Sequence, residues 1–155
     1  MILLSLGSNL GNREDYLAQA RIVLEMFDVA VVKASSIHET PALVPEGAPA
    51  EWNIPYLNQV LRVETHLGPR ELLACIKHIE ADLGRKPASR WAPREIDIDI
   101  LAYDDVLMVE DFLTLPHAQM DTRRFVLAPL CEIAPEWKHP VLGKTAAEML
   151  SELPA

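Results

Sequence analysis

The spacing of hydrophobic residues predicts strands and helices along the first half of the chain. Residues 2–6 form an apolar run typical of a short buried strand, and a turn is expected at residues 7–9. In residues 13–27 the apolar positions recur at helical spacing, which predicts a helix. Residues 29–35 predict a second strand, and residues 57–65, where apolar and polar positions alternate, predict a third.

A second helix is predicted over residues 69–84, because Leu and Ile recur there at helical spacing. Pro69 stands near its start and Gly84 at its end, as the preferences of helix termini expect. The alternating residues 95–103 predict the next strand. The order strand–helix–strand therefore occurs twice, which favours an α+β domain with helices on one face of an antiparallel sheet.

The last third of the chain predicts smaller elements. A turn at residues 104–105 is expected to lead the strand into the apolar residues 106–109. Asp121 is expected to cap a short helix over residues 122–128. Residues 145–148 form a capping box, which predicts a final helix.

A long proline-rich loop separates the second and third predicted strands. Residues 41–55 contain four prolines and Gly47. Loops of this length inside a compact domain are usually functional or disordered. We therefore expect residues 43–55, together with residues 84–92, to be mobile without ligand and to close over it as a lid.

Length and charge restrict the class of protein. The 155 residues fit one domain over residues 1–155, and the net charge of −9 argues against a nucleic-acid-binding surface. No apolar run approaches the roughly 20 residues of a membrane helix, and residues 2–6 are too short for a secretory signal. We therefore expect a soluble, cytoplasmic protein. Cys75 and Cys131 lie in apolar runs and are expected to be buried free thiols.

Two aspartates in one predicted strand suggest chemistry. Asp97 and Asp99 alternate with Ile96, Ile98 and Ile100, and residues i and i+2 of a strand point the same way. We expect the isoleucines to face the core and the carboxylates to face away from it, roughly 6.6 Å apart along the strand. Such a pair suits Mg²⁺, or bridges a pair of metal ions. The alternative is a solvated strand face, although Asp is disfavoured in strands.

Basic residues precede the aspartates in this acidic chain. They lie within ten positions of one another and are Arg85, Lys86, Arg90 and Arg94. Arginine binds phosphate in a bidentate manner, so arginines beside carboxylate-bound Mg²⁺ indicate phosphoryl transfer. Two competing interpretations are a different Mg²⁺ enzyme on a similar fold, such as a nucleotidyl cyclase or polymerase palm, and a non-catalytic ligand-binding domain.

Six motifs carry a resemblance to a known family. Residues 90–101, R-W-A-P-R-E-I-D-I-D-I-L, resemble the signature of 6-hydroxymethyl-7,8-dihydropterin pyrophosphokinase, an enzyme of folate biosynthesis. The supporting segments, in order, are L-G-S-N-L at 6–10, S-S-x-x-x-T-P at 35–41, Y-L-N at 56–58, E-x-x-L-G-R at 80–85 and P-H-x-x-x-x-x-R-x-F-V-L-x-P-L at 116–130. The resemblance covers nearly the whole chain.

The resemblance implies both a fold and a reaction. The fold is a ferredoxin-like βαββαβ core with helices packed on an antiparallel sheet, plus a C-terminal hairpin and further helices. The reaction transfers the β,γ-diphosphoryl group of ATP to the hydroxymethyl oxygen of the pterin, releases AMP and uses two Mg²⁺ ions. A functional link to dihydropteroate synthase is also implied.

The family's functional residues fall on matching positions of this chain in three groups. Those implied in catalysis are Arg85, Arg94, Asp97 and Asp99, with the two aspartates holding Mg²⁺. Those implied in ATP binding are Glu80, Arg94, Ile100, Thr114, His117 and Arg123. Those implied in pterin binding are Thr40, Pro41, Leu43, Tyr56, Asn58, Trp91 and Phe125. In this pocket Tyr56 and Phe125 would stack on the two faces of the ring, and Asn58 would bind its polar edge.

Several positions depart from the family's usual pattern. Ala92 replaces the glycine of R-W-G-P-R, and Pro87 stands where many members have a second basic residue. His38 stands where an aromatic residue is common, and residues 43–55 are longer than in compact members. These departures concern the loops and leave the aspartate pair unchanged.

Overall fold

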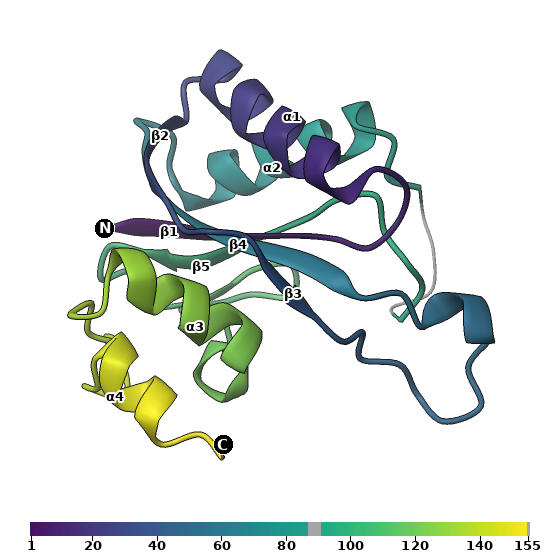
Figure 1. The fold of residues 1–155 in the computed structure, drawn as a ribbon. Helices are drawn as coiled ribbons and strands as arrows, with labels where there is room; N and C mark the ends of the chain where they lie inside the picture. The colour runs from purple at the N-terminus through teal and green to yellow at the C-terminus, as the bar shows by residue number, and fades with distance from the viewer. Residues whose placement is uncertain (87–90, 155) are drawn as a thin grey trace.

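The fold is an antiparallel sheet with helices on both of its faces (Figure 1). A computed structural model of the chain describes residues 1–86 and 91–154. The strands are β1 (Ile2–Ser8), β2 (Ala30–Ala34), β3 (His38–Thr40), β4 (Tyr56–Glu64), β5 (Asp97–Tyr103), β6 (Met108–Val109) and β7 (Thr114–Leu115). The helices are α1 (Arg13–Met26), α2 (Pro69–Asp82), α3 (Arg124–Ile133) and α4 (Ala146–Ser151), with 3₁₀ turns at Ala50–Trp52 and Met120–Thr122.

The strand order confirms the ferredoxin-like α+β core expected from the sequence. Along the sheet the order is β2-β4-β1-β5, and β3 pairs with the beginning of β4. The central strand β1 is antiparallel to both of its neighbours, β4 and β5. The β6–β7 hairpin and the helices α3 and α4 are the additional C-terminal elements.

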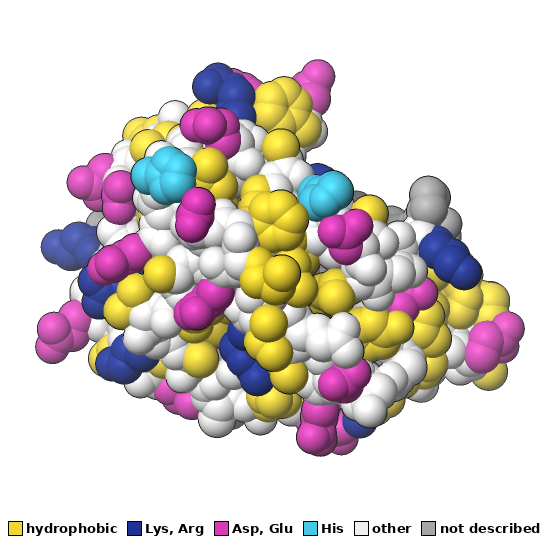
Figure 2. All heavy atoms as spheres, turned by 90° about the horizontal axis from the view of Figure 1, so that it is seen from above, with side chains coloured by type: hydrophobic (Ala, Val, Ile, Leu, Met, Phe, Trp, Pro, Cys, Tyr) yellow, Lys and Arg dark blue, Asp and Glu magenta, His cyan; other side chains and the backbone are white. Residues whose placement is uncertain are grey.

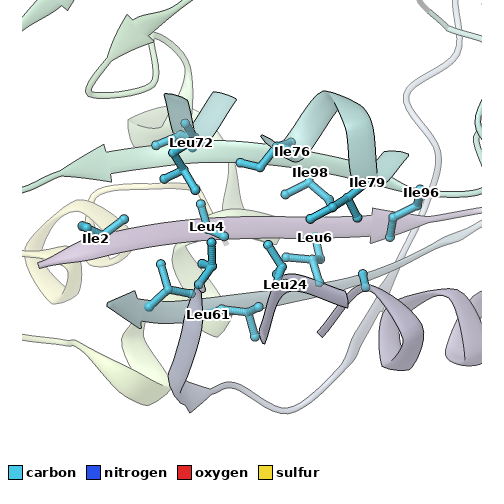
Figure 3. Close-up of a cluster of buried hydrophobic side chains, with 14 of the residues drawn as sticks. Ile2, Leu4, Leu6, Leu24, Leu61, Leu72, Ile76, Ile79, Ile96 and Ile98 are labelled. Carbon is cyan, nitrogen blue, oxygen red and sulfur yellow. The ribbon is translucent and has the colours of Figure 1, made fainter. Parts of the chain in front are cut away.

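One face of the sheet packs against α1 and α2 and forms the larger core (Figures 1 and 3). Leu4 and Leu6 of β1 point to this face, as does Ile98 of β5, and α2 contributes Leu72 and Ile76. Burying one such side chain stabilises the fold by about 1.5–3 kcal/mol. Burial of Ile98 and Ile100 in this core therefore determines which face of β5 points to the helices, and the isoleucines face the core as predicted.

The opposite face carries a second core, which corrects the expectation of helices on one face only. Leu3, Val60 and Leu101 lie on this face and are buried against Leu127 and Leu130 of α3. Because these sheet residues are also apolar, they need a cover, and α3 with α4 provides it (Figure 1). The remaining part of this face holds the candidate site.

The predicted turn at residues 7–9 was wrong, because β1 continues through Ser8. Gly7 pairs with Asn58 on one side and Asp97 on the other. A Cβ at Gly7 would lie 3.3 Å from the Tyr56 ring. Glycine inside this strand thus marks a close approach of another side chain rather than the end of the strand.

One further local prediction was also wrong. Asp121 does not cap a helix over 122–128, since it lies in a 3₁₀ turn and α3 begins at Arg124. The Met120 side chain anchors this 3₁₀ turn because it is fully buried in the second core. The predicted turn at residues 104–105 is present after β5, and residues 108–109 beyond it pair with β7. The short strand β3 and the 3₁₀ turn within residues 41–55 were not predicted from the sequence.

The final helix has the predicted capping box. The Glu148 backbone N–H donates to the Thr145 hydroxyl, and the Thr145 N–H donates to the Glu148 carboxylate, each at 3.1 Å. Cys75 and Cys131 are free, as predicted, but half-buried rather than fully buried.

The surface over α1 and α2 mixes charged and apolar side chains (Figure 2). On this face Lys and Arg are interspersed with Asp and Glu, so positive charge is not gathered into one patch there. The exposed apolar side chains include Ile22 and Met26 of α1. None of the helices within residues 1–86 and 91–154 is long and apolar enough to cross a membrane.

Candidate active site

A cavity of about 200 Å³ lies between the sheet and α3. Its floor comes from alternate residues of β1 and β5, and α3 forms one wall. The residues that line it are Ser5, Gly7, Thr40, Pro41, Leu43, Tyr56, Asn58, Trp91, Arg94, Asp97, Asp99, Leu101, His117, Arg123, Phe125 and Val126.

Both aspartates of β5 line this cavity, as their alternation with isoleucine predicted. Across the strand pair, Asp97 lies opposite Gly7 and Asp99 lies opposite Ser5. Small residues at these two positions of β1 leave the space beside the carboxylates open. Side chains on one face of paired strands are direct neighbours, so larger residues there would fill the site.

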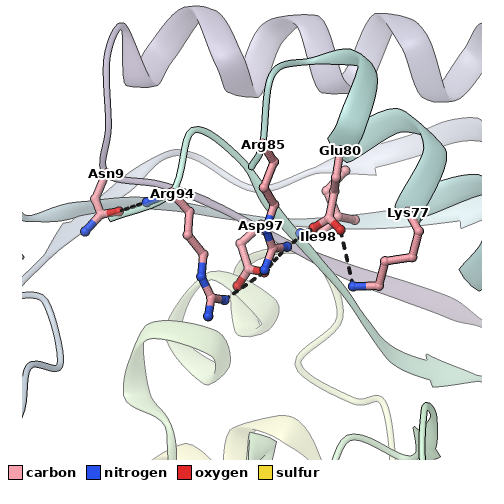
Figure 4. A network of polar contacts seen from close by, with 7 residues as sticks. All are labelled: Asn9, Lys77, Glu80, Arg85, Arg94, Asp97 and Ile98. Carbon is pink, nitrogen blue, oxygen red and sulfur yellow. Dashed lines mark hydrogen bonds and ion pairs between the residues drawn. The ribbon is translucent and has the colours of Figure 1, made fainter. Parts of the chain in front are cut away.

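Two arginines neutralise Asp97 (Figure 4). The Nη1 atoms of Arg85 and Arg94 lie 3.0 Å and 3.3 Å from its Oδ1. Arg85 comes from the segment after α2 and Arg94 from the segment before β5, so the two guanidinium groups reach one carboxylate from different directions. Asp97 is thus paired with two cations that come from separate segments of the chain.

The buried Glu80 carboxylate holds Arg85 in place (Figure 4). Its Oε2 accepts hydrogen bonds from Arg85 at 2.5 Å and from the Ile98 N–H at 2.8 Å, and its Oε1 lies 3.2 Å from the Lys77 ammonium. Because β5 is an edge strand, Glu80 also satisfies a backbone donor at the open edge. Glu80 therefore ties α2, β5 and Arg85 together.

The surroundings of Asp99 disfavour its charged form. Burial, together with the nearby Asp97 carboxylate, raises the pKa of Asp99 to about 7. A carboxylate whose pKa is raised in this way lacks sufficient positive charge around it. The site therefore favours the addition of a cation.

His117 and Arg123 border the same cavity near α3. The backbone N–H of His117 donates to the Leu101 carbonyl at 2.8 Å. The ring Nδ1 of His117 accepts from the backbone N–H of Gln119 at 3.2 Å. Because a backbone N–H can only donate, Nδ1 carries no proton and Nε2–H is the donor of the neutral ring. Burial, with a smaller contribution from Arg123, lowers the pKa of His117 and keeps it neutral.

Aromatic and amide side chains form the other part of the cavity. Tyr56 and Asn58 begin β4, and the Asn58 amide donates to the Thr40 hydroxyl at 2.6 Å. Phe125 comes from α3, where the Arg123 guanidinium lies 5.5 Å from its ring centre. Trp91 lines the cavity from the segment before β5. A flat heteroaromatic ring fits such a set, because stacking and edge recognition need these groups.

The structure brings together most of the predicted site residues. All the predicted pterin-binding residues line the cavity, as do Arg94, Asp97, Asp99, His117 and Arg123. That these residues contact the pterin, ATP or Mg²⁺ remains a prediction. Arg90 and Pro87 lie outside the described residues.

Four predicted residues do not line the cavity: Glu80, Arg85, Ile100 and Thr114. Arg85 is connected to the cavity by its ion pair with Asp97, which lines it. Glu80 is buried and forms an ion pair with Arg85. The Ile100 side chain lies in the core under the helices, so it offers a nucleotide only its backbone. Thr114 lies half-buried in the β6–β7 hairpin.

Four lining residues were not predicted: Ser5, Gly7, Leu101 and Val126. Ser5 and Gly7 occupy the alternate positions of β1 between its buried leucines, so strand alternation together with strand pairing would have indicated them. Leu101 and Val126 are ordinary apolar residues, and no sequence signal distinguishes them from the core.

The aspartate pair fits a hard cation. Within residues 1–86 and 91–154, no group of three or more His, Cys, Asp or Glu side chains could hold a metal ion. Two carboxylates completed by phosphate oxygens and water are typical of Mg²⁺. The oxygen-only donors and the raised pKa of Asp99 agree with such a site.

Comparison with known proteins identifies the family. Residues 3–135 match the family model for 7,8-dihydro-6-hydroxymethylpterin-pyrophosphokinase (HPPK). The chain belongs to this family. An HPPK relative from Aquifex aeolicus, named 2-amino-4-hydroxy-6-hydroxymethyldihydropteridine pyrophosphokinase, is 40% identical over 151 residues, covering 97% of this chain and 91% of its own. The relative of the same name from Bacillus subtilis is 44% identical over 131 residues, covering 84% of this chain and 75% of its own.

Other relatives are larger than this chain. A folate synthesis bifunctional protein from Chlamydia trachomatis is 40% identical over 160 residues, which covers 99% of this chain but 36% of that protein. The chain thus spans about a third of the length of this protein and of the bifunctional relatives from two other Chlamydia species. The wild-type Plasmodium falciparum HPPK-DHPS structure matches with a TM-score of 0.73 over 97% of this chain and 44% of that chain. At 17% identity, this match supports the HPPK fold alone.

Proposed function

We propose that this HPPK chain transfers the β,γ-diphosphoryl group of ATP to the hydroxymethyl oxygen of 6-hydroxymethyl-7,8-dihydropterin. The hydroxymethyl oxygen attacks the β-phosphorus, the bond from that phosphorus to the oxygen of the α-phosphate breaks, and AMP leaves. The hydroxyl proton passes to water. The products are the pterin diphosphate and AMP, so atoms and charge balance without a covalent enzyme intermediate.

The observation that carries this proposal is the position of the aspartates. Asp97 and Asp99 line one cavity together with Arg94, His117 and Tyr56. An aromatic pocket directly beside a phosphate-binding group is what an acceptor alcohol and a triphosphate need in order to react. Holding two reactants in this geometry supplies much of the rate of phosphoryl transfer.

Asp97 and Asp99 would hold the Mg²⁺ ions. When bound, two Mg²⁺ ions would neutralise phosphate oxygens and favour ionisation of the acceptor hydroxyl. Arg85 and Arg94, which now pair with Asp97, can turn to the transferring group once its carboxylate binds a cation. In this proposal His117 donates to a phosphate oxygen from Nε2–H, in agreement with the hydrogen bond that its Nδ1 accepts.

The pterin would occupy the aromatic part of the cavity. Tyr56 and Phe125 come from opposite sides, one from the sheet and one from α3, as a ring stacked on both faces requires. Burial, with a smaller contribution from the Asp97 carboxylate, raises the pKa of Tyr56, so the ring remains neutral and apolar at pH 7. Asn58 is nearly fully buried and presents an amide to the polar edge.

The test is AMP release from MgATP in the presence and absence of the pterin. The proposal predicts AMP only when both substrates and Mg²⁺ are present. A nucleotidyl cyclase or polymerase would release pyrophosphate without the pterin, and a binding domain would turn over neither. A D97A variant that keeps near-normal turnover would refute the assignment of the aspartates.

We also propose that the product is passed to dihydropteroate synthase. The relatives that are named as bifunctional folate synthesis proteins support this link. A cytoplasmic location stays a prediction from the sequence.

A further inference from the structure

Asn9 lies where the two halves of the site meet. It follows the end of the central strand β1, which runs antiparallel to both β4 and β5. The end of β1 therefore lies beside the beginnings of both neighbours. The segment before β4 leads into Tyr56, which is proposed above to bind the pterin, and the segment before β5 carries Arg94, which is proposed to bind phosphate; both residues line the cavity.

The Asn9 side chain binds both segments (Figure 4 shows the contact with Arg94). Its Nδ2 donates to the Ile54 carbonyl at 3.0 Å, and its Oδ1 accepts from the Arg94 N–H at 2.8 Å. The Asn9 N–H also donates to the Arg94 carbonyl at 3.1 Å. Asn9 is 1% exposed, and its two side-chain hydrogen bonds are partly buried, so water competes little for them.

Both hydrogen bonds need an amide at this position. The Ile54 carbonyl can only accept, and the Arg94 N–H can only donate, so one orientation of the Asn9 amide satisfies both. An aspartate would keep the acceptor for Arg94 and lose the donor for Ile54. An alanine would lose both of these partly buried hydrogen bonds, which is costly.

These bonds bear directly on side chains of the proposed site. Arg94 is held through both its N–H and its carbonyl, and its guanidinium lies 3.3 Å from Asp97. Ile54 stands two residues before Tyr56, and Arg13 holds the intervening Pro55 carbonyl at 2.8 Å.

We infer that Asn9 is a positioning residue that fixes the pterin-binding segment and the phosphate-binding segment relative to each other. This inference rests on the proposed function of the site. It gives a physical role to the L-G-S-N-L motif, because the strand must continue through Gly7 and Ser8 to place the amide between the two segments.

Two substitutions separate the two contacts. N9D removes the donor to Ile54 and keeps the acceptor for Arg94. Pterin binding should therefore weaken about tenfold, as loss of one partly buried hydrogen bond predicts, and MgATP affinity should stay within about twofold of wild type. N9A removes both contacts, so it should also lower kcat at saturating substrates by about tenfold or more, as misplacement of a charge-stabilising group predicts.

The matched control is N12A. Asn12 lies three residues further on and caps α1 by accepting from the Asp15 N–H at 3.1 Å. Loss of this cap should lower the melting temperature by about 3 °C and leave substrate affinity and kcat unchanged. If N9D and N9A change only the melting temperature, as N12A does, then Asn9 is merely structural and the inference fails.

Amide hydrogen exchange gives a readout that does not depend on activity. The Arg94 amide should lose protection in N9A and keep it in N9D. Equal protection in both variants would overturn the inference even if turnover changed. If N9A does not fold, N9D decides by its effect on pterin binding. A wild-type chain that releases no AMP would instead refute the proposed function, with the exchange result still standing.

Discussion

Replacing Asp99 with Asn should stabilise the ligand-free protein at neutral pH while removing its activity. Asp99 lies at the floor of the cavity, where burial and the Asp97 carboxylate raise its pKa to about 7. The folded protein therefore places a carboxylate where it is disfavoured until a cation arrives. Asparagine has nearly the same shape but carries no charge, so it removes this penalty.

The magnitude follows from the difference in pKa between the folded and unfolded states. An unfolded aspartate has a pKa of about 3.9, and each tenfold change in proton affinity is worth about 1.4 kcal/mol, so the penalty at pH 8 is at most about 4 kcal/mol. Water in the open cavity and the nearby cations Lys77 and Arg123 reduce it. We expect D99N to be more stable than wild type by about 1–2 kcal/mol at pH 8.

The pH dependence has a definite sign. Between about pH 4 and pH 7 the folded wild-type protein binds a proton at Asp99 that the unfolded chain has lost, so wild-type stability falls as pH rises through this range. Below about pH 4 both states are protonated and the penalty is absent. The advantage of D99N should therefore grow from near zero at pH 4 to its full value above pH 7.

The assay is denaturant unfolding at several pH values, with D97N as the matched control. Asp97 pairs with Arg85 and Arg94, so its replacement removes attractive contacts and should not stabilise the fold. Both variants should lack diphosphoryl transfer, and added Mg²⁺ with a non-hydrolysable ATP analogue should stabilise wild type only. A D99N protein no more stable than wild type at pH 8, or a difference independent of pH, would refute this reasoning.

Four other perturbations test separate parts of the site. F125A should weaken pterin binding by about 1 kcal/mol and N58A by roughly 1–3 kcal/mol, with little change in MgATP affinity, as separate titrations with pterin and with MgATP would show. If both variants lose ATP affinity and keep pterin affinity, the pterin pocket has been placed on the wrong side of the metal-binding aspartates. Amides of residues 43–55 should exchange more slowly with both ligands bound, and equal exchange would argue against a closing lid. E80Q should cost about 1–3 kcal/mol in denaturant unfolding, because Arg85 loses its buried counter-charge, and wild-type stability would show that this pair contributes nothing.

The sequence by itself determined the faces of the strands and the chemistry of one segment. Alternation of isoleucine with Asp97 and Asp99 decides that the carboxylates point away from the helices, because a strand has a period of two. The boundaries of α2 follow from local signals near Pro69 and Gly84. The motifs were specific enough to indicate the HPPK family, and the family comparison confirmed it.

Local signals failed where distant parts of the chain decide the outcome. Gly7 looked like the end of a strand, yet pairing with both neighbours carries β1 past it. Asp121 looked like a helix cap, yet burial of Met120 in the second core sets where the turn lies and where α3 begins. In each case tertiary packing overrides a weak local preference.

Only the tertiary structure decided how the site is assembled. Sequence spacing could not show that Glu80 lies behind Arg85, or that the Asn9 amide lies between Ile54 and Arg94. The two Asn9 contacts join residues 45 and 85 positions apart in the chain, and they exist because antiparallel pairing places the end of β1 between the beginnings of β4 and β5. A pattern of hydrophobic and polar residues specifies which face a side chain takes, whereas strand order and register specify its neighbours.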